Sequence, residues 1–291
     1  MKSIWAVLVN YKNYRLTIEC VESLRKARSD GLHIVIVDNN SPDNSYEQLI
    51  KELPDEIIIK SEENNGFSAG NNIGIKYALE NNADYVMLLN NDTVIDEAMI
   101  EQLLSKTDDL TVTVPKMYYY SQPDIIWYAG GTINKKTGKT YHIGENRHDD
   151  GSYAEQKHVD FATGCCIMMS KAVIEKVGLW DESFFLYWED VDYSFRLTAA
   201  GIKILYVPEA KLWHKVNAST GSSSPLTVYY ANRNRMYIMK KYKFPITAWI
   251  YFYITRFVYL FKAVFSRSSD KYIMAAIKDF KAGIMGKSEH I

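Results

Sequence analysis

Residues 57–92 read IIIKSEENNGFSAGNNIGIKYALENNADYVMLLNND. An apolar β-branched run opens this stretch, an Asn- and Gly-rich loop follows, and a helical pattern over 69–81 leads into a second apolar run at 85–89. A strand, a helix and a strand at this spacing are typical of a βαβ unit, in which the two strands run parallel. The stretch therefore predicts an α/β fold.

The same alternation runs through the first 115 residues. It predicts strands at 4–9, 33–37, 57–59, 85–89 and 112–114, and helices at 14–28, 45–53, 69–81 and 96–106. We therefore expect a mainly parallel, Rossmann-like sheet with helices on both faces. Such sheets bind their ligands outside the carboxyl ends of the strands.

The chain beyond residue 115 follows a different pattern. We expect, in chain order, a hairpin excursion over 118–160, a strand at 164–169, a helix at 171–177, a helix that follows the acidic cluster at 188–192 and runs to 200, and a loop at 221–225. The remaining residues are expected to be helical. We divide the chain into a domain of residues 1–224 and a C-terminal region of residues 225–291.

The composition excludes several classes of protein. With 291 residues, 47% apolar and 24% charged, the chain matches a globular domain rather than a disordered chain or a disulfide scaffold. Its cysteines, Cys20, Cys165 and Cys166, form no CxxC pair, so we expect buried thiols in a reducing cytoplasm. The first residues predict a strand and no signal peptide. A net charge of −1 argues against a nucleic-acid partner.

The C-terminal region differs from the rest in charge. Residues 225–291 hold 12 Lys and Arg against three Asp and Glu, whereas the first 224 residues are acidic. Residues 246–265 are apolar and aromatic, but Arg256 and Lys262 interrupt them. This pattern predicts a helix that lies in the interface of an anionic membrane. A helix packed on the domain or on a second subunit, as in a homodimer, is the alternative.

Polar motifs follow the predicted strands. Asp38 ends the second strand, where its carboxylate can accept the N3–H of uracil or thymine, or can cap the next helix. The loop at 64–74 combines glycines with a helix start, which suits phosphate, although a plain turn is the alternative. It matches neither the dinucleotide nor the P-loop fingerprint. Asp92 can hold a divalent metal at the end of the fourth strand, or cap a turn.

Two further candidates lie beyond residue 180. Glu189 and Asp190 stand in an aromatic setting, where burial raises the pKa of a carboxyl and suits a general base. A helix start that favours acidic residues is the alternative reading. His214 is a lone histidine, and such a residue is more often structural than a ligand.

In this order the motifs resemble glycosyltransferase family 2, in its rhamnosyltransferase-like branch. The resemblance covers residues 1–240, and its strength is the ordered series of motifs. The series is Val9-Asn10-Tyr11, Val37-Asp38-Asn39-Asn40-Ser41, Asn65-Gly66-Phe67, Gly70-Asn71-Asn72, Gly74, Asn90-Asn91-Asp92, Gly164, Asp181-Glu182, Phe184-Phe185, Glu189-Asp190-Val191-Asp192, Arg196, Gly201, His214, Tyr229-Tyr230 and Arg233-Asn234.

The resemblance implies the A-type nucleotide-diphospho-sugar transferase fold. Residues 1–115 would then be the nucleotide-sugar-binding half and 116–224 the acceptor-side half of a catalytic domain. It implies inverting transfer from a pyrimidine-diphospho-sugar, dTDP-rhamnose or a UDP-hexose, to a saccharide acceptor. Together with the C-terminal region it predicts a lipid-linked acceptor, surface polysaccharide synthesis, and a cytoplasmic enzyme held at the inner face of the cell membrane.

The resemblance also implies a role for each matching residue. Asp190 would be the catalytic base, and Glu189 would hold the acceptor or orient the base. Asp92 would ligate Mg²⁺ or Mn²⁺, with His214 as a further metal or phosphate contact. The nucleotide would be bound by Asn10, Tyr11, Asp38, Asn65, Gly66, Gly70, Asn71, Asn90 and Arg233, the last of which could instead belong to a basic helical face.

One departure from the family pattern concerns the metal. Many relatives carry Asp-x-Asp, whereas this chain has Asn90-Asn91-Asp92, with a single carboxylate. Two other functions stay open. A sugar nucleotidyltransferase would carry a Gly-rich basic loop after the first strand, where this chain has Asn10-Tyr11-Lys12-Asn13. A membrane-associated scaffold would bind nucleotide without turnover.

Overall fold

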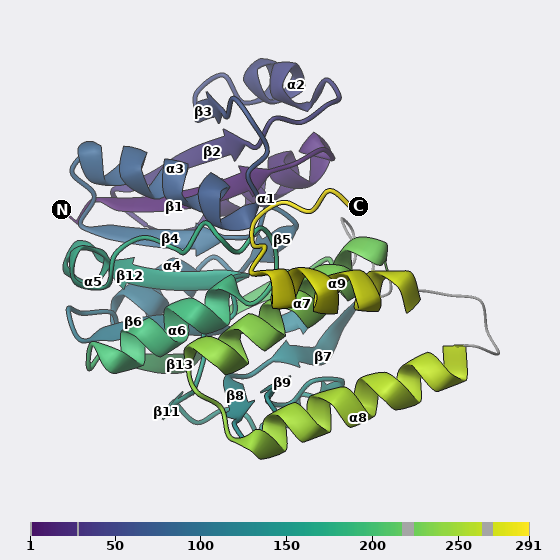
Figure 1. The fold of residues 1–291 in the computed structure, drawn as a ribbon. Helices are drawn as coiled ribbons and strands as arrows, with labels where there is room; N and C mark the ends of the chain where they lie inside the picture. The colour runs from purple at the N-terminus through teal and green to yellow at the C-terminus, as the bar shows by residue number, and fades with distance from the viewer. Residues whose placement is uncertain (1, 28, 217–223, 264–269, 291) are drawn as a thin grey trace.

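The computed structural model describes residues 2–27, 29–216, 224–263 and 270–290 (Figure 1). One large sheet dominates it, with strands in the order β10-β7-β6-β12-β4-β1-β2-β3 and with β5, β11 and β13 attached to this path. These strands are β1 (Ile4–Asn10), β2 (Leu32–Asp38), β3 (Ile57–Lys60), β4 (Tyr85–Leu89), β5 (Thr93–Ile95), β6 (Thr111–Tyr119), β7 (Gln122–Tyr128), β10 (Arg147–His148), β11 (Lys157–His158), β12 (Cys166–Ser170) and β13 (Lys203–His214). A separate hairpin joins β8 (Gly131–Asn134) to β9 (Lys139–His142).

The prediction of a mainly parallel sheet is confirmed. β1 pairs in parallel with β2 and β4, β2 with β3, and β6 with β13. β12 is antiparallel to both of its neighbours, β4 and β6, so β6 and β13 run in the same direction as the first four strands. The apolar runs of β1, β2 and β4 are almost entirely buried, as expected for strands covered on both faces.

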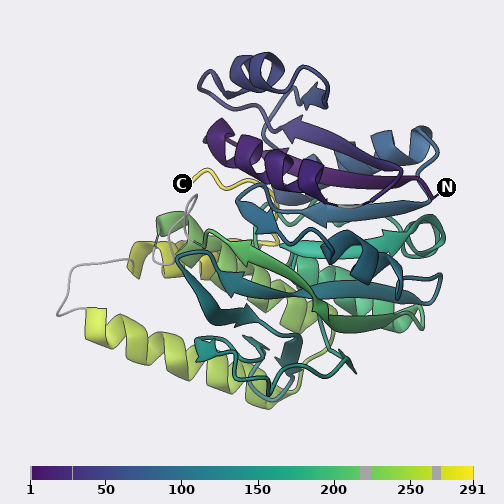
Figure 2. The same ribbon diagram turned by 180° about the vertical axis from the view of Figure 1, so that it is seen from behind.

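Helices cover both faces of the sheet, as predicted. Figure 1 shows α3, α5 and α6 in front of it, and Figure 2 shows α1 and α4 on the opposite face. The helices are α1 (Tyr14–Lys26), α2 (Ser45–Glu52), α3 (Phe67–Glu80), α4 (Met99–Leu104), α5 (Lys171–Val177), α6 (Glu189–Ala199), α7 (Pro225–Lys241), α8 (Ile246–Ala263) and α9 (Asp270–Ala282). The expected hairpin excursion is present as β7 and the β8–β9 hairpin.

Three strands differ from the sequence prediction. β6 is three times as long as the run at 112–114, and β5 and the twelve-residue β13 were not predicted. Pro208 and Glu209 interrupt the apolar pattern of β13, and its pairing with β6 shifts register between Val207 and Lys211. A bulge at this point accommodates the proline, which cannot donate to the ladder.

The glycines of α3 serve helix–strand packing. A Cβ added to Gly74 would lie 2.3 Å from a methyl group of Val7, and one added to Gly70 would lie 2.8 Å from a methyl group of Val9. Both glycines therefore let α3 approach β1 closely. The prediction that Gly70 opens the backbone to a ligand is not supported by this orientation, because its open side faces β1.

The C-terminal helices are built onto the sheet domain. Ser224 caps α7 by accepting a hydrogen bond from Thr227 N at 3.1 Å, and Pro225 follows it at the first helical position. Met236 and Phe252 share an apolar cluster with Phe184 and Val191 of the domain. Within the described ranges, no helix is both long enough and apolar enough to cross a bilayer.

Candidate active site

The carboxyl ends of β1 and β2 are joined by a buried polar network. Asn10 Nδ2 donates to Asp38 Oδ2 at 2.8 Å, and Ser41 donates to the same carboxylate from both its hydroxyl, at 2.7 Å, and its N–H, at 2.9 Å. Neither Asn10 nor Asp38 is exposed to solvent. In this arrangement Asp38 holds the first turn after β2. Oδ1 of Asp38 accepts only one of these bonds, and a contact between Asp38 and a nucleotide base remains a prediction.

Asp92 and His214 are far apart in the sequence but lie next to each other in the fold. Thr93 of β5 pairs with His214 of β13, and this register leaves Oδ1 of Asp92 3.0 Å from Nε2 of His214. Both side chains are at least nine-tenths buried. Oδ1 of Asp92 has no partner besides His214 Nε2, and Nδ1 of His214 and Oδ1 of Asn90 have no hydrogen-bond partner among the described residues. Unsatisfied buried acceptors are costly, so this cluster is suited to a cation.

The geometry of this pair fits a divalent metal. Two cis ligands at bond lengths of about 2.1–2.2 Å on an octahedral ion lie about 3 Å apart. Within the described part of the chain, no group of three or more His, Cys, Asp or Glu side chains is arranged to hold a metal. Further ligands of a cation at this position would therefore be of other kinds, such as the Asn90 amide oxygen, a diphosphate or water.

Two aromatic residues that the sequence analysis did not single out complete the surroundings of His214. The Trp127 ring meets His214 edge to face at 4.4 Å, and it meets His142 in the same manner at 4.7 Å. Burial lowers the pKa of His142 to about 4, and the nearby His214 adds to this effect. His142 is therefore neutral at physiological pH and adds no positive charge beside the candidate metal ligands.

Asp190 and Glu189 begin α6 and differ in their partners. The Asp190 carboxylate accepts hydrogen bonds from Gly164 N at 3.1 Å and Val191 N at 2.8 Å. Oε2 of the buried Glu189 has no partner among the described residues. Burial raises the pKa of both carboxyls, and the charge of Asp190 raises that of Glu189 further. The N–H groups of Gly164 and Val191 oppose the rise in the pKa of Asp190. Of the two carboxyls, Asp190 is therefore the one favoured to be ionised.

The backbone connects Asp190 to the metal candidate. Gly164, which donates to Asp190, precedes Cys165, whose carbonyl oxygen accepts from Asn90 N at 2.8 Å. Asn90 lies two residues before Asp92, at the end of β4. The acidic pair at the start of α6 and the Asp92–His214 pair therefore belong to the same edge of the sheet, at the carboxyl ends of the parallel strands.

The loop between β3 and α3 closes against the segment ahead of α6. Phe67 N donates to Phe185 O at 2.8 Å, and Asn39 Nδ2 donates to Gly66 O at 3.0 Å. Gly66 has a φ of 94°, and an added Cβ would lie 2.2 Å from Phe185 O, so only glycine fits. Asn65 is exposed, as is Tyr11, and both are accessible to a ligand. Asn71 is buried, and its Nδ2 donates to Phe67 O.

Arg233 does not reach this edge. Its guanidinium is fully buried and donates to Asn234 Oδ1 at 3.0 Å, Gly286 O at 2.9 Å and Tyr229 OH at 3.3 Å. It also lies over the Tyr229 and Tyr230 rings. With these partners Arg233 fixes the C-terminal segment, so we do not retain it among the residues proposed to bind the nucleotide.

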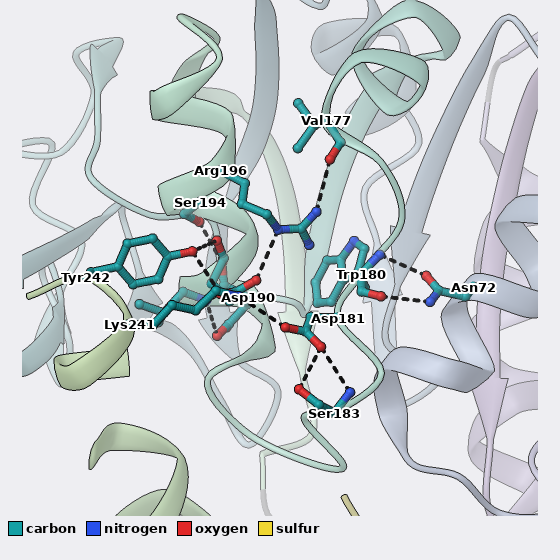
Figure 3. A network of polar contacts seen from close by, with 12 residues as sticks. Asn72, Val177, Trp180, Asp181, Ser183, Asp190, Ser194, Arg196, Lys241 and Tyr242 are labelled. Atoms are coloured by element: carbon teal, nitrogen blue, oxygen red, sulfur yellow. Dashed lines mark hydrogen bonds and ion pairs between the residues drawn. The ribbon is translucent and has the colours of Figure 1, made fainter. Parts of the chain in front are cut away.

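Asp192 of the acidic motif and Asn72 of α3 have structural partners (Figure 3). Asp192 is fully buried and binds Arg196 Nε at 3.0 Å, Lys241 Nζ at 2.7 Å and Tyr242 OH at 2.8 Å. Asn72 donates to Trp180 O at 2.9 Å and accepts from Trp180 N at 3.0 Å. These bonds tie α6 to the end of α7, and α3 to the segment that precedes the acidic pair.

Comparison with known proteins identifies the family. The family model described as glycosyl transferase family 2 matches residues 5–178, more than half of the chain. This chain belongs to glycosyl transferase family 2. The family 2 chain is 30% identical over 235 residues to the low-salt glycan biosynthesis hexosyltransferase Agl10 of Haloferax volcanii, covering 79% of this chain and 73% of the relative. It is 24% identical over 253 residues to the dTDP-rhamnosyl transferase RfbF of Shigella flexneri, covering 84% and 82%.

A solved structure agrees with the fold of this glycosyltransferase. The structure of GalNAc-T7 with UDP, GalNAc and Mn²⁺ superposes with a TM-score of 0.63 at 17% identity, and the match covers 80% of this chain and 47% of that one. At this identity the likeness concerns the fold alone, and it confirms the glycosyltransferase A-type fold. The family membership and the fold predicted by the resemblance are therefore both confirmed.

The burial of the Glu189 carboxyl leads to a prediction about stability. Because burial raises its pKa in the folded chain, the fold favours the protonated form, and this contribution to stability is lost as pH rises through the raised pKa. Glu189→Gln is expected to melt at a higher temperature than the wild type at pH 8, by roughly 2–4 °C per kcal/mol relieved, with little difference at pH 4. Thermal melts across this range measure the effect.

Glu47 provides the control, since it is exposed and pairs loosely with Lys60 at 3.9 Å. Glu47→Gln is expected to leave the melting temperature nearly unchanged at every pH. If Glu189→Gln lowers the melting temperature at pH 8, and does so more than at pH 4, Glu189 is held as a carboxylate by an ionic partner, and its burial does not disfavour its charge.

Proposed function

We propose that this chain is an inverting, metal-assisted glycosyltransferase that takes a sugar from a pyrimidine-diphospho-sugar and passes it to a saccharide acceptor. The observation that carries the proposal is the shared edge that joins Asp190, through Gly164 and Cys165, to the Asp92–His214 pair. A base and a cation site on one edge are what a single displacement of a nucleoside diphosphate requires.

Asp190 would act as the base in one step. Its carboxylate accepts the proton of the acceptor hydroxyl while that oxygen forms a bond to the anomeric carbon and the bond from this carbon to the diphosphate breaks. Attack from the face opposite the leaving group inverts the anomeric centre. Asp92 and His214 would hold Mg²⁺ or Mn²⁺, whose charge would offset that of the leaving diphosphate.

The N–H groups of Gly164 and Val191 would keep Asp190 oriented and ionised before the proton arrives. Glu189 lies next to it, and its Oε2, which has no partner in the part of the chain that the structure describes, suits a contact to an acceptor hydroxyl. We propose that the nucleotide binds at the ends of β1, β2 and β4 and the start of α3. The residues that line or support this region are Asn10, Tyr11, Asp38, Asn65, Gly66, Asn71 and Asn90.

The donor is proposed to be dTDP-rhamnose or a UDP-hexose. The similarity to a dTDP-rhamnosyl transferase and to a hexosyltransferase of glycan synthesis supports this choice, as it supports a role in polysaccharide synthesis. Titration calorimetry with UDP, dTDP, GDP and CDP, each with and without Mn²⁺, tests the proposal. We expect selective binding of UDP or dTDP, strengthened by Mn²⁺. Selective binding of GDP would overturn the pyrimidine assignment.

We further propose that α8 rests on an anionic membrane surface and brings the enzyme to a lipid-linked acceptor. Its exposed apolar side chains recur every three or four residues and form one outer face, namely Ile246, Ile250, Tyr253, Ile254, Phe257 and Val258. Phe257 is 71% exposed. The region that contains α8 is strongly basic, and a basic, aromatic amphipathic helix suits a membrane interface.

Vesicle binding tests the membrane contact. The wild type is expected to sediment with vesicles that contain phosphatidylglycerol and much less with phosphatidylcholine alone, because the basic charge needs an anionic surface. Ile250→Asp with Phe257→Asp should abolish sedimentation, whereas Ile50→Asp, an exposed site on α2, should not. Equal sedimentation of the double variant would contradict the proposal. A wild type that ignores vesicles but dimerises, with the double variant monomeric, would assign this face to a second subunit.

A further inference from the structure

An unusual backbone conformation leads into the acidic pair. Tyr187 and Trp188 have φ values of 66° and 74°, in the left-handed region that non-glycine residues rarely adopt. Trp188 is the residue directly before α6, so Glu189 and Asp190 are its first two helical residues. Left-handed backbone costs about 1–2 kcal/mol per residue and persists only where the surroundings hold it. The direction of the Asp190 carboxylate therefore depends on whatever holds these two residues.

Asn234 of α7 makes the contacts that hold them. Its Nδ2 donates to Leu186 O at 2.9 Å and to Tyr187 O at 2.9 Å, so both hydrogens of one amide are used on consecutive carbonyls. Asn234 is fully buried. Removal of the amide would take away a buried donor to both carbonyls.

Arg233 sets the orientation of that amide. Arg233 Nε donates to Asn234 Oδ1 at 3.0 Å, and a guanidinium can only donate. The amide oxygen must therefore face Arg233, and the NH₂ group must face the loop. Arg233 itself donates to Gly286 O, and Gly286 N donates to Ser183 O at 2.8 Å. The chain around Gly286 thus joins α7 to the segment that begins the loop.

From these contacts we propose that Asn234 is a positioning residue for the catalytic base. It holds the left-handed pair Tyr187–Trp188 and so fixes the direction in which Asp190 leaves α6, while Arg233 fixes Asn234. The inference rests on the proposed function for the identity of the base, but the clamp itself is a structural statement. It also gives α7, which lies outside the residues that the family model matches, a role at the edge of the sheet that holds Asp190.

The test compares two asparagines of the same helix. Asn234→Asp keeps the size of the side chain and the contact to Arg233, but it replaces the NH₂ donor with an acceptor that repels the two carbonyls. Asn232→Asp is the control, since Asn232 is also buried, donates to Val228 O and accepts from Arg256, and does not touch the loop. Asn234→Ala is the second variant in case Asn234→Asp does not fold.

Hydrogen exchange gives a readout that does not depend on turnover. In Asn234→Asp we expect faster exchange at amides 186–192, with amides of β1 and β4 unchanged, and in Asn232→Asp no change at 186–192. We also expect kcat to fall about 10- to 100-fold while the KM for donor and the affinity for UDP or dTDP stay the same, because the base is misdirected and the nucleotide site is intact. The acidic limb of the pH profile should move as well.

The outcomes separate the clamp from the function. Wild-type exchange at 186–192 in a folded Asn234 variant would overturn the clamp. Faster exchange with an unchanged kcat and pH profile would overturn the positioning role. If the wild type turns over no sugar nucleotide, the proposed function fails, and the exchange data still decide whether Asn234 holds the loop.

Discussion

Asp190→Asn is expected to lower the rate of sugar transfer by about two to four orders of magnitude while leaving the affinity for UDP or dTDP unchanged. The asparagine keeps the shape of the side chain, but it cannot take a proton from the acceptor. Initial rates of nucleoside diphosphate release measure the effect. Asp160→Asn is the matched control, because Asp160 is exposed and accepts only from Ile133 N among the described residues.

The pH profile gives this prediction a second readout. Burial raises the pKa of Asp190, and a base must be ionised to work, so kcat/KM is expected to fall on the acid side at a pH above the ordinary aspartate range. That limb should disappear in Asp190→Asn. A variant that retains transfer within a factor of two, with the acid limb in place, would contradict the assignment of the base.

Asp92→Ala is expected to weaken Mn²⁺-dependent binding of UDP or dTDP by about 100-fold or more. The variant removes the only carboxylate of the candidate metal pair, and metal-assisted charge stabilisation is worth several kcal/mol. Binding without Mn²⁺ should barely change, because the nucleoside contacts lie elsewhere on the edge. Calorimetric titration at several Mn²⁺ concentrations measures both quantities.

The control for this variant lies at the opposite edge of the sheet. Asp84 precedes β4, is exposed, and accepts from Ser3 N at 2.8 Å. Asp84→Ala should leave nucleotide binding and its Mn²⁺ dependence intact. An Asp92→Ala variant with the same Mn²⁺ dependence as the wild type would mean that the diphosphate is neutralised by other groups.

The central sheet could be predicted because local pattern and tertiary environment agree there. β1, β2 and β4 are continuous apolar runs, and the structure buries them on both faces. β13 could not be predicted in this way, because Pro208 and Glu209 break its apolar pattern, and only its pairing with β6 makes it a strand. A strand whose identity depends on a distant partner has no local signature.

The candidate site was predictable in residue type but not in arrangement. Asp92 and His214 are 122 positions apart, and only the pairing of β5 with β13 makes them neighbours. Arg233 matched the family motif, yet its burial and its bond to Gly286 make it structural. Asn234 stood in the motif series without a predicted role, and Trp127 and His142 were not among the motifs, because an amide or a ring becomes informative only when its partner is known.

The two rival functions make different predictions for the same variants. A nucleotide-binding scaffold would lose nothing with Asp190→Asn, because it transfers no proton. A sugar nucleotidyltransferase would release pyrophosphate from a nucleoside triphosphate, and its first strand would be followed by a basic Gly-rich loop. β1 ends instead in Asn10, which is fully buried and hydrogen-bonded to Asp38, and this arrangement favours the transferase.

The most direct test is the configuration of the sugar that the enzyme releases. Wild-type protein with Mn²⁺ is incubated with dTDP-rhamnose or a UDP-hexose, and proton NMR follows the first product before it equilibrates in solution. We predict a sugar with the anomeric configuration opposite to that of the donor, because one base and one displacement act at the centre. A product that retains the donor configuration, or no turnover of any pyrimidine-diphospho-sugar tested, would contradict an inverting transferase built on Asp190.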